Sequence, residues 1–213
     1  VSTNNGNDYA DNGSAQVGDT VTFKLTAKVP DMTDYKTYKF VFHDTLSNGL
    51  AFDANSVNVT VAGKAVTEDT DYTVVAPSDA SKELTVTFEN LKNVKGADTD
   101  AEIVVTYTAK ITKDAVKDNP AKNTVYLEYS NDPSSKGTGK SNPDVSKVYT
   151  YQIDIDKFAV TEGNTHKQLA GATFELRATA DGAAIELVKE TTQDNTLVYH
   201  IKGTDETEAT PVT

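Results

Sequence analysis

The sequence predicts an all-β protein made of two tandem β-sandwich domains, the second of them incomplete. Two observations carry this prediction. Between residues 20 and 130, short segments alternate apolar and polar residues and are separated by Gly, Asp, Asn or Pro turns. Successive side chains of a strand point to opposite faces, so each such segment is expected to bury one face. A smaller group of alternating segments follows after residue 148. Many short strands with regular turns are typical of a sandwich.

The first predicted domain covers residues 1–146. It begins with a loop over residues 1–18, which show no periodicity. A turn is expected at residues 47–49, Ser-Asn-Gly, and helix only as a turn or two near residues 114–117. Residues 131–146 are polar and rich in Pro, Gly and Ser, which predicts a linker. Strands are predicted at residues 21–29, 38–44, 50–52, 57–61, 72–75, 84–88, 103–111 and 123–129.

The second predicted domain covers residues 147–213 and opens with a strand over residues 149–157. A polar turn at residues 161–167 follows, and further strands are expected at residues 174–176, 185–187 and 197–201. Four strand segments are few for a closed sandwich, so we expect this domain to be truncated.

Lys157 is in phase with the apolar side of that opening strand, which consists of Tyr149, Tyr151, Ile153 and Ile155. Burying an ammonium is costly unless it is paired or loses its charge. Two interpretations therefore stay open. Either the strand ends at Ile155 and Lys157 reaches solvent, or Lys157 is buried, uncharged and nucleophilic.

Composition excludes several classes of function. The net charge of −12, with Arg177 as the one arginine, disfavours nucleic acid and anionic membrane surfaces as partners. No apolar run approaches the ~20 residues that span a bilayer, and neither a signal peptide nor a C-terminal anchor is evident, so we expect a mature piece. The absence of cysteine rules out disulfides and thiolate metal sites. The Asn/Asp/Gly cluster at residues 4–13 lacks the spacing of a calcium loop, so neither a metal nor a cofactor is expected.

Familiar catalytic motifs are missing from the sequence, and the three histidines are expected to lie on the surface, without carboxylate partners. Three polar residues nevertheless fall in phase with apolar rows: Asp44, Asn123 and Lys157. They are the residue types needed for a spontaneous Lys–Asn amide crosslink. Burial favours the neutral, nucleophilic amine, a nearby amide supplies the carbonyl, and a protonated carboxyl group shuttles protons as ammonia leaves.

The three residues are not expected to form one crosslink, because Lys157 opens the second domain. The first domain offers an acid, Asp44, and an amide, Asn123, but Lys24 and Lys28 alternate outward. Its lysine is therefore expected before Val1. For Lys157, the weak partner candidates are Glu186, Glu190 and Asn195, since the closing strands are expected after Thr213.

Several segments resemble the middle domain of the backbone (major) pilins of Gram-positive bacteria, the shaft subunits that sortases polymerise. They are VGDTVTFKLTAKVP at residues 17–30, FHDTLSNGL at 42–50, VVTYTA at 104–109 and NTVYLEYSNDP at 123–133. The segments IDK at residues 155–157 and QLAGATFEL at 168–176 resemble the start of a collagen-adhesin B-type domain. The resemblance covers nearly the whole chain and implies immunoglobulin-like sandwiches.

The resemblance also implies roles. Asp44 matches the family's acid, Asn123 its crosslinked amide, and Lys157 the lysine of the following domain. It implies a non-enzymatic fimbrial subunit that is secreted, anchored to the cell wall and joined covalently by sortase to neighbouring subunits. Two alternatives stay open: a modular adhesin that binds a host surface ligand, and a carbohydrate-binding β-sandwich module.

Overall fold

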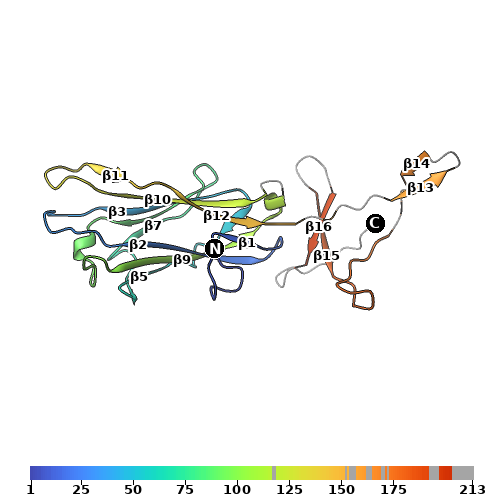
Figure 1. Ribbon diagram of the computed structural model, residues 1–213, viewed down its shortest axis with the longest axis horizontal. Helices are drawn as coiled ribbons and strands as arrows, with labels where there is room; N and C mark the ends of the chain where they lie inside the picture. Colours follow the sequence, from blue (N-terminus) through green and yellow to red (C-terminus); the bar gives the residue numbers. More distant parts are fainter. Residues whose placement is uncertain are drawn as a thin grey trace. The chain divides into compact units, whose positions relative to one another are not determined.

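The computed structural model describes residues 1–116, 119–151, 153, 157–161, 165–168, 171, 173–191 and 197–202 (Figure 1). The chain divides into two compact units. The first consists of Val1–Ala15 and Thr20–Thr150, and the second of Gln16–Asp19 and Tyr151–Thr213. The described residues form strands with two short 3₁₀ helices, η1 (Leu91–Asn93) and η2 (Lys113–Val116). None of these helices has the length and apolar character needed to cross a membrane.

The larger sheet of the first unit is built around β10, which pairs with β12, β3 and β11. Its order is β1-β12-β10-β3-β8-β7, and β11 pairs with the far end of β10. All pairs are antiparallel except β1 with β12, which run parallel. The strands are β1 (Asn12–Ser14), β3 (Phe40–Leu46), β7 (Thr73–Val75), β8 (Glu83–Phe88), β10 (Ala121–Ser130), β11 (Thr138–Lys140) and β12 (Asp144–Tyr149).

The smaller sheet has the order β2-β9-β5-β6, and β4 also pairs with β9. Its long strands β2 and β9 pair in antiparallel register from Thr20↔Lys110 to Lys28↔Glu102. β2 is an edge strand, and its free edge is met near one end by an antiparallel bridge between Ser2 and Thr22. The strands are β2 (Thr20–Lys28), β4 (Leu50–Phe52), β5 (Asn58–Val61), β6 (Lys64–Ala65) and β9 (Glu102–Ile111).

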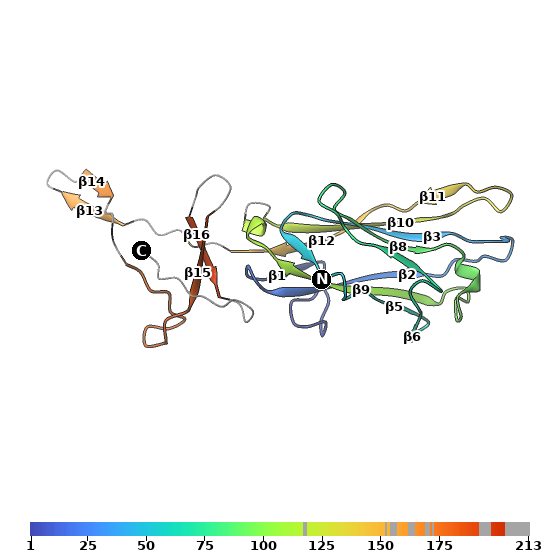
Figure 2. The ribbon, with the colours of Figure 1, turned by 180° about the vertical axis from the view of Figure 1, so that it is seen from behind.

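The two sheets lie one on the other as the layers of a sandwich, visible from both sides (Figures 1 and 2). Alternate residues of the strands fill the space between them, as a period of two requires. On β9 every second residue from Ile103 to Ile111 is buried, and the strands that face it contribute a matching row. The core rows include Val21, Phe23 and Leu25 of β2, Phe40 and Phe42 of β3, and Leu84, Val86 and Phe88 of β8.

The sequence-based prediction of an all-β sandwich is confirmed. Leu50 donates its backbone N–H to the Ser47 carbonyl at 3.0 Å, which closes the expected turn, and η2 lies where a short helical turn was expected. The linker predicted at residues 131–146 is wrong. Its residues include β11 and the first half of β12, which pair with β10.

The prediction of a core-facing strand over residues 149–157 is also wrong for the described residues. Both ladders that hold β12 end there, because Ser14 of β1 pairs with Tyr149 and Ala121 of β10 with Val148. Tyr151 and Ile153 are 78% and 73% exposed, and Lys157 is exposed outside any strand. Alternation with period two favours an extended backbone, but a β-strand also needs an adjacent strand to which its backbone can hydrogen-bond.

Among the described residues, the second unit contains two antiparallel strand pairs. β13 (Phe158–Thr161) pairs with β14 (Thr165–Gln168), and β15 (Leu187–Thr191) pairs with β16 (Leu197–Ile201). The polar turn expected over residues 161–167 is wrong for Thr161 and for Thr165 to Lys167, which are strand residues. The expected strand at residues 197–201 is confirmed.

Candidate functional site

Asp44 and Asn123 lie close together on the inner face of the larger sheet. Their strands β3 and β10 are antiparallel neighbours, in a register that places Val125 opposite Asp44 and Asn123 opposite Leu46. Asp44 and Asn123 are therefore diagonal neighbours on one face of the ladder. Both are buried, with exposures of 0% and 2%. The structure brings together the acid and the amide that the sequence singled out.

Tyr107 of β9, in the opposite sheet, joins these two side chains. Its hydroxyl donates a hydrogen bond to Asp44 Oδ2 at 2.6 Å and accepts one from Asn123 Nδ2 at 2.6 Å. The ring is stacked on Phe23 with centroids 5.3 Å apart and meets the edge of Phe52 at 5.5 Å. Buried aromatic contacts of this kind hold the ring, and so its hydroxyl, in place.

The site keeps its acid protonated more readily than water does. Burial raises the pKa of Asp44 to about 6, against the opposing effect of its hydrogen-bonding neighbours Tyr107 and Asn123. Burial also raises the pKa of Tyr107 well above its ordinary value, and the adjacent Asp44 carboxylate adds to that shift. The phenol is therefore a neutral donor at every ordinary pH, whereas Asp44 exchanges its proton near neutrality.

One oxygen of the site is unpaired. Asp44 Oδ1 is buried and lacks a hydrogen-bond partner among the described residues. Leaving a buried carboxyl oxygen unpaired is costly, which makes it a natural position for a further donor. The structure does not supply that donor as a lysine, because no lysine of the described residues is buried. Lys24 and Lys28 are exposed, as expected from the sequence, and the Lys24 ammonium lies over the Tyr9 ring.

A groove opens beside Asn123, between the free edge of β2 and the strands β10 and β12. It holds about 190 Å³ and is lined by residues from both sheets. Val125 and Leu127 of β10 face it and are only half-buried, although they are in phase with Asn123. Its apolar lining comes mainly from Val1, Phe23, Leu25, Phe42, Val125 and Leu127.

Lys157 and its candidate partners are not brought together in the described residues. Lys157 is exposed, and Glu186 pairs instead with Lys202 at 2.9 Å. Glu190 lies in β15 opposite Val198, and Asn195 is outside the described residues. A crosslink through Lys157 stays a prediction.

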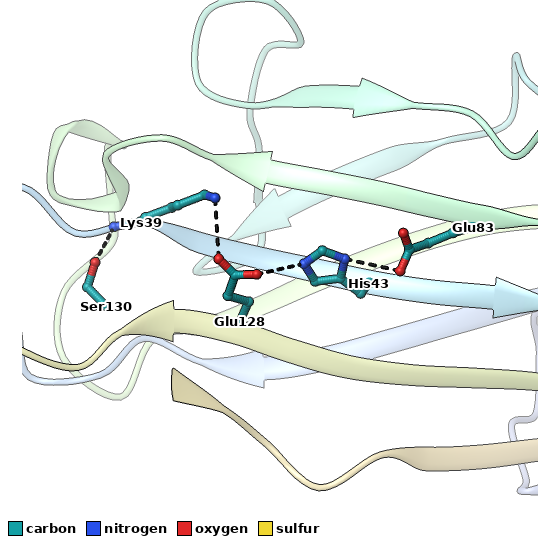
Figure 3. A network of polar contacts seen from close by, with 5 residues as sticks. All are labelled: Lys39, His43, Glu83, Glu128 and Ser130. Carbon is teal, nitrogen blue, oxygen red and sulfur yellow. Dashed lines mark hydrogen bonds and ion pairs between the residues drawn. The ribbon is translucent and has the colours of Figure 1, made fainter. Parts of the chain in front are cut away.

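The outer face of β3 carries a second polar network, centred on His43 (Figure 3). His43 lies between two carboxylates, with Nδ1 3.2 Å from Glu83 and Nε2 3.3 Å from Glu128. Glu128 also meets the Lys39 ammonium at 3.4 Å, and the backbone N–H of Lys39 donates to Ser130 Oγ at 3.0 Å. The expectation of a histidine without carboxylate partners is wrong here, because cross-strand neighbours on β8 and β10 supply them.

Tyr107 is a member of the site that the sequence does not predict. The sequence places it within an apolar row of β9, where a tyrosine reads as a core residue. The available signal was its hydroxyl, since a buried tyrosine hydroxyl usually needs a hydrogen-bond partner. Which partner it finds depends on how the two sheets face each other, and one sequence does not contain that information.

The chain is similar to a known family of proteins. Residues 17–133, more than half of the chain, match the family described as Gram-positive pilin backbone subunit 2, Cna-B-like domain. A curated relative, the trypsin-resistant surface T6 protein of Streptococcus pyogenes serotype M6, is 24% identical over 193 residues. That match covers 79% of this chain but 34% of the relative, so the chain spans about a third of its length.

Two solved structures share the fold. The 35 kDa C-terminal fragment of the major pilin GBS80 of Streptococcus agalactiae superposes with a TM-score of 0.61 at 23% identity, covering 95% of this chain and 75% of that one. The T6 backbone pilin of serotype M6 Streptococcus pyogenes superposes with a TM-score of 0.60 at 19% identity, covering 94% and 42%. At these identities the likeness establishes the fold.

Proposed function

Because this chain belongs to the family of Gram-positive pilin backbone subunits, we propose that it is a structural part of a pilus shaft whose first unit is closed by a self-formed Lys–Asn isopeptide bond. Backbone pilins are structural subunits rather than enzymes. The observation that carries the crosslink is the buried pair of Asp44 and Asn123 beside an open groove. The acid of this pair has a pKa raised to about 6.

The groove suggests where the lysine comes from. Ser2 and Thr22 form an antiparallel bridge, with backbone hydrogen bonds of 2.7 and 2.9 Å in the two directions. Continued upstream in this register, a segment preceding Val1 would run along the free edge of β2. Val1 would then lie opposite Phe23, and the residue two positions before Val1 opposite Leu25. Opposite residues of an antiparallel pair share a face, so that side chain would point into the groove.

A lysine in this position has the chemistry that the crosslink needs. Burial against the apolar part of the lining, which includes Phe23 and Leu25, favours its neutral amine, which attacks Cγ of Asn123. Protonated Asp44 gives a proton as ammonia leaves and takes one back from the new amide nitrogen. Holding the groups on packed strands supplies proximity, which accounts for much of the acceleration in intramolecular reactions.

The bond would give the shaft a mechanical advantage. It would tie an upstream strand on one sheet to β10 on the other, so that tension would act on a covalent bond rather than on strand pairing alone. Proteolysis requires local opening, and a crosslinked sandwich opens less readily. We propose neighbouring pilus subunits, joined by a sortase at the cell surface, as the partners of this chain. A host ligand stays a prediction.

Intact mass tests the proposal directly. We propose two forms of the chain extended before Val1, one with lysine two positions upstream and one with lysine immediately upstream. The first should lose ammonia, about 17 Da, on folding, because its amine enters the groove. The second should keep its full mass, because its lysine faces outward. An unchanged mass in the first form, or the same loss in both, would contradict the proposed crosslink geometry.

Asp44→Ala in the first form separates chemistry from placement. The strand register is unchanged, but the proton shuttle is gone. The mass loss should disappear. If it persists, a different group serves as the acid.

A further inference from the structure

Tyr107 lies between the acid and the amide of the proposed reaction rather than beside them. Its hydroxyl is 2.6 Å from Asp44 Oδ2 and 2.6 Å from Asn123 Nδ2. The latter nitrogen is the atom that would leave as ammonia. Tyr107 is 1% exposed, and its ring is held by Phe23 and Phe52. The crosslinking reaction proposed for the lysine, Asp44 and Asn123 does not yet include this hydroxyl.

The number of protons on Asp44 and Tyr107 determines which group donates in each of the two hydrogen bonds. A phenol has one proton to donate. When Asp44 is ionised, Tyr107 gives that proton to Oδ2, so the group of Asn123 that faces Tyr107 must be a donor. This is the observed arrangement, with Nδ2 directed at the hydroxyl. It places the leaving nitrogen, not the carbonyl oxygen, against Tyr107.

When Asp44 is protonated, the direction of these two hydrogen bonds can reverse. The carboxyl group then donates to Tyr107 Oη, and the phenol proton is free to turn toward Asn123 Nδ2. A proton can thus move from Asp44 to the leaving nitrogen without an ionised tyrosine. Chains of buried hydrogen bonds strengthen one another in a low-dielectric interior, which favours such a concerted shift.

We propose that Tyr107 is a catalytic residue of the crosslinking reaction, which relays a proton from the Asp44 carboxyl group to Asn123 Nδ2 as ammonia departs. This inference rests on the proposed function. It assigns the protonation of the leaving group to a residue on β9, in the sheet opposite the acid and the amide.

The step balances without any further reactant. The neutral lysine amine forms a bond to Cγ of Asn123, and the carbonyl electron pair moves to Oδ1. Tyr107 gives its proton to Nδ2 and takes one from Asp44. The Cγ–Nδ2 bond breaks, the carbonyl reforms and ammonia leaves. The new amide nitrogen then returns its extra proton to Asp44, which ends as it began.

The pKa values of the two groups agree with this order of transfer. Burial raises the pKa of Asp44 to about 6, so that both of its protonation states are accessible near neutrality. The raised pKa of Tyr107 keeps the phenol neutral throughout.

The test measures the rate of ammonia loss in the extended chain with the in-register lysine. The chain is purified unfolded, diluted into folding buffer and sampled by intact mass. Tyr107→Phe keeps the ring and removes only the hydroxyl. We expect a rate on the order of 10²-fold lower, the scale of lost general-acid catalysis. Tyr72→Phe, in which another buried tyrosine loses its hydroxyl, should react at the parent rate.

The outcomes separate this inference from the function on which it rests. If the parent form loses no ammonia, the proposed function fails. If the parent and Tyr107→Phe react equally fast, the relay is wrong and the crosslink stands. A proton inventory of the parent form, with rates measured in mixtures of H₂O and D₂O, covers the case in which Tyr107→Phe does not fold. The relay moves two protons in one step, so the rate should depend quadratically on the deuterium fraction, and a linear dependence would overturn it.

Discussion

A single carboxyl group accounts for most of the chemical character of the first unit. Asp44 is fully buried, one of its oxygens is bonded to Tyr107, and the other lacks a partner among the described residues. Such a residue weakens the fold when it is charged, because burial disfavours the ionised form. A role in a reaction, rather than a contribution to stability, therefore explains why an aspartate occupies this core position.

The pH dependence of stability should reveal the buried acid. The pKa of Asp44 is about 6 in the folded chain, compared with 3.8 for an unperturbed aspartate such as that of the unfolded chain. Between these values the folded state binds the proton more tightly than the unfolded chain. Asp44 therefore lowers the free energy of unfolding as pH rises from about 4 to about 6, by about 3 kcal/mol. Urea unfolding at pH 4 and pH 7 measures this change.

Asp44→Asn removes the titrating group and nearly keeps its shape. The variant should lose that part of the pH dependence. The difference in free energy of unfolding between variant and parent should therefore change by about 3 kcal/mol between pH 4 and pH 7. The exposed Asp98→Asn serves as the control and should follow the parent. Equal pH profiles for the parent and Asp44→Asn would show that Asp44 titrates normally.

Glu128 on the outer face should act in the opposite direction. Burial alone would raise its pKa, but the hydrogen bond and charge of Lys39, together with His43, leave that pKa lowered. Its contribution is thus present above the ordinary pKa and lost as pH falls through the folded value. Glu128→Gln should cost up to about 1 kcal/mol at pH 7 and nothing near pH 3. The exposed Glu102→Gln is the control, and a cost that persists at pH 3 would point to packing instead.

Among the elements, strands with strong alternation were predictable and those defined by a neighbour were not. The rows of β2, β8 and β9 show their buried faces directly in the sequence. β12 does not, because it lies near an edge of the sheet and its Val145 is 37% exposed. Its polar residues indicated a linker, and pairing with β10 made them a strand. Equally, alternation after Tyr149 indicated a strand where both supporting ladders stop.

The turn between β3 and β4 depends on the small size of Gly49. A Cβ there would lie 2.6 Å from Ala115 Cα and 2.9 Å from its backbone nitrogen. Backbone atoms of η2 cannot give way as a flexible side chain can. Gly49→Ala should therefore destabilise the unit by about 1–3 kcal/mol, the range for overpacking. Chemical denaturation with unchanged m-value would measure it.

Two variants identify the cause of that loss. Ala115→Gly should not rescue Gly49→Ala, because the nearest obstacle is backbone. Gly137→Ala meets only side-chain atoms, the nearest being Asn131 Oδ1 at 3.0 Å, and should cost much less. Full rescue by Ala115→Gly would locate the clash in the Ala115 methyl group instead.

At the scale of the whole molecule, the sequence predicts two domains with a boundary after residue 146. The first compact unit extends to Thr150 rather than to residue 146. The predicted boundary follows the polar composition of residues 131–146. In the structure, the first unit ends where the pairing of β12 with its neighbours ends. The intersheet link through Tyr107 was hidden for a related reason, since the facing of two sheets is a long-range property.

Truncation decides which boundary defines a folding unit. A fragment that ends after Thr150 keeps Val148 in the core, opposite Ala121, and keeps the two hydrogen bonds between Thr150 and Asn119 at 2.8 and 3.2 Å. A fragment that ends after Ser146 loses all of these contacts and half of β12. Burial of one valine alone is worth about 1.5–3 kcal/mol. The shorter fragment should thus be less stable by at least about 3 kcal/mol once the lost backbone hydrogen bonds are included. Urea unfolding followed by circular dichroism measures the difference, and equal midpoints for the two fragments would return the boundary to residue 146.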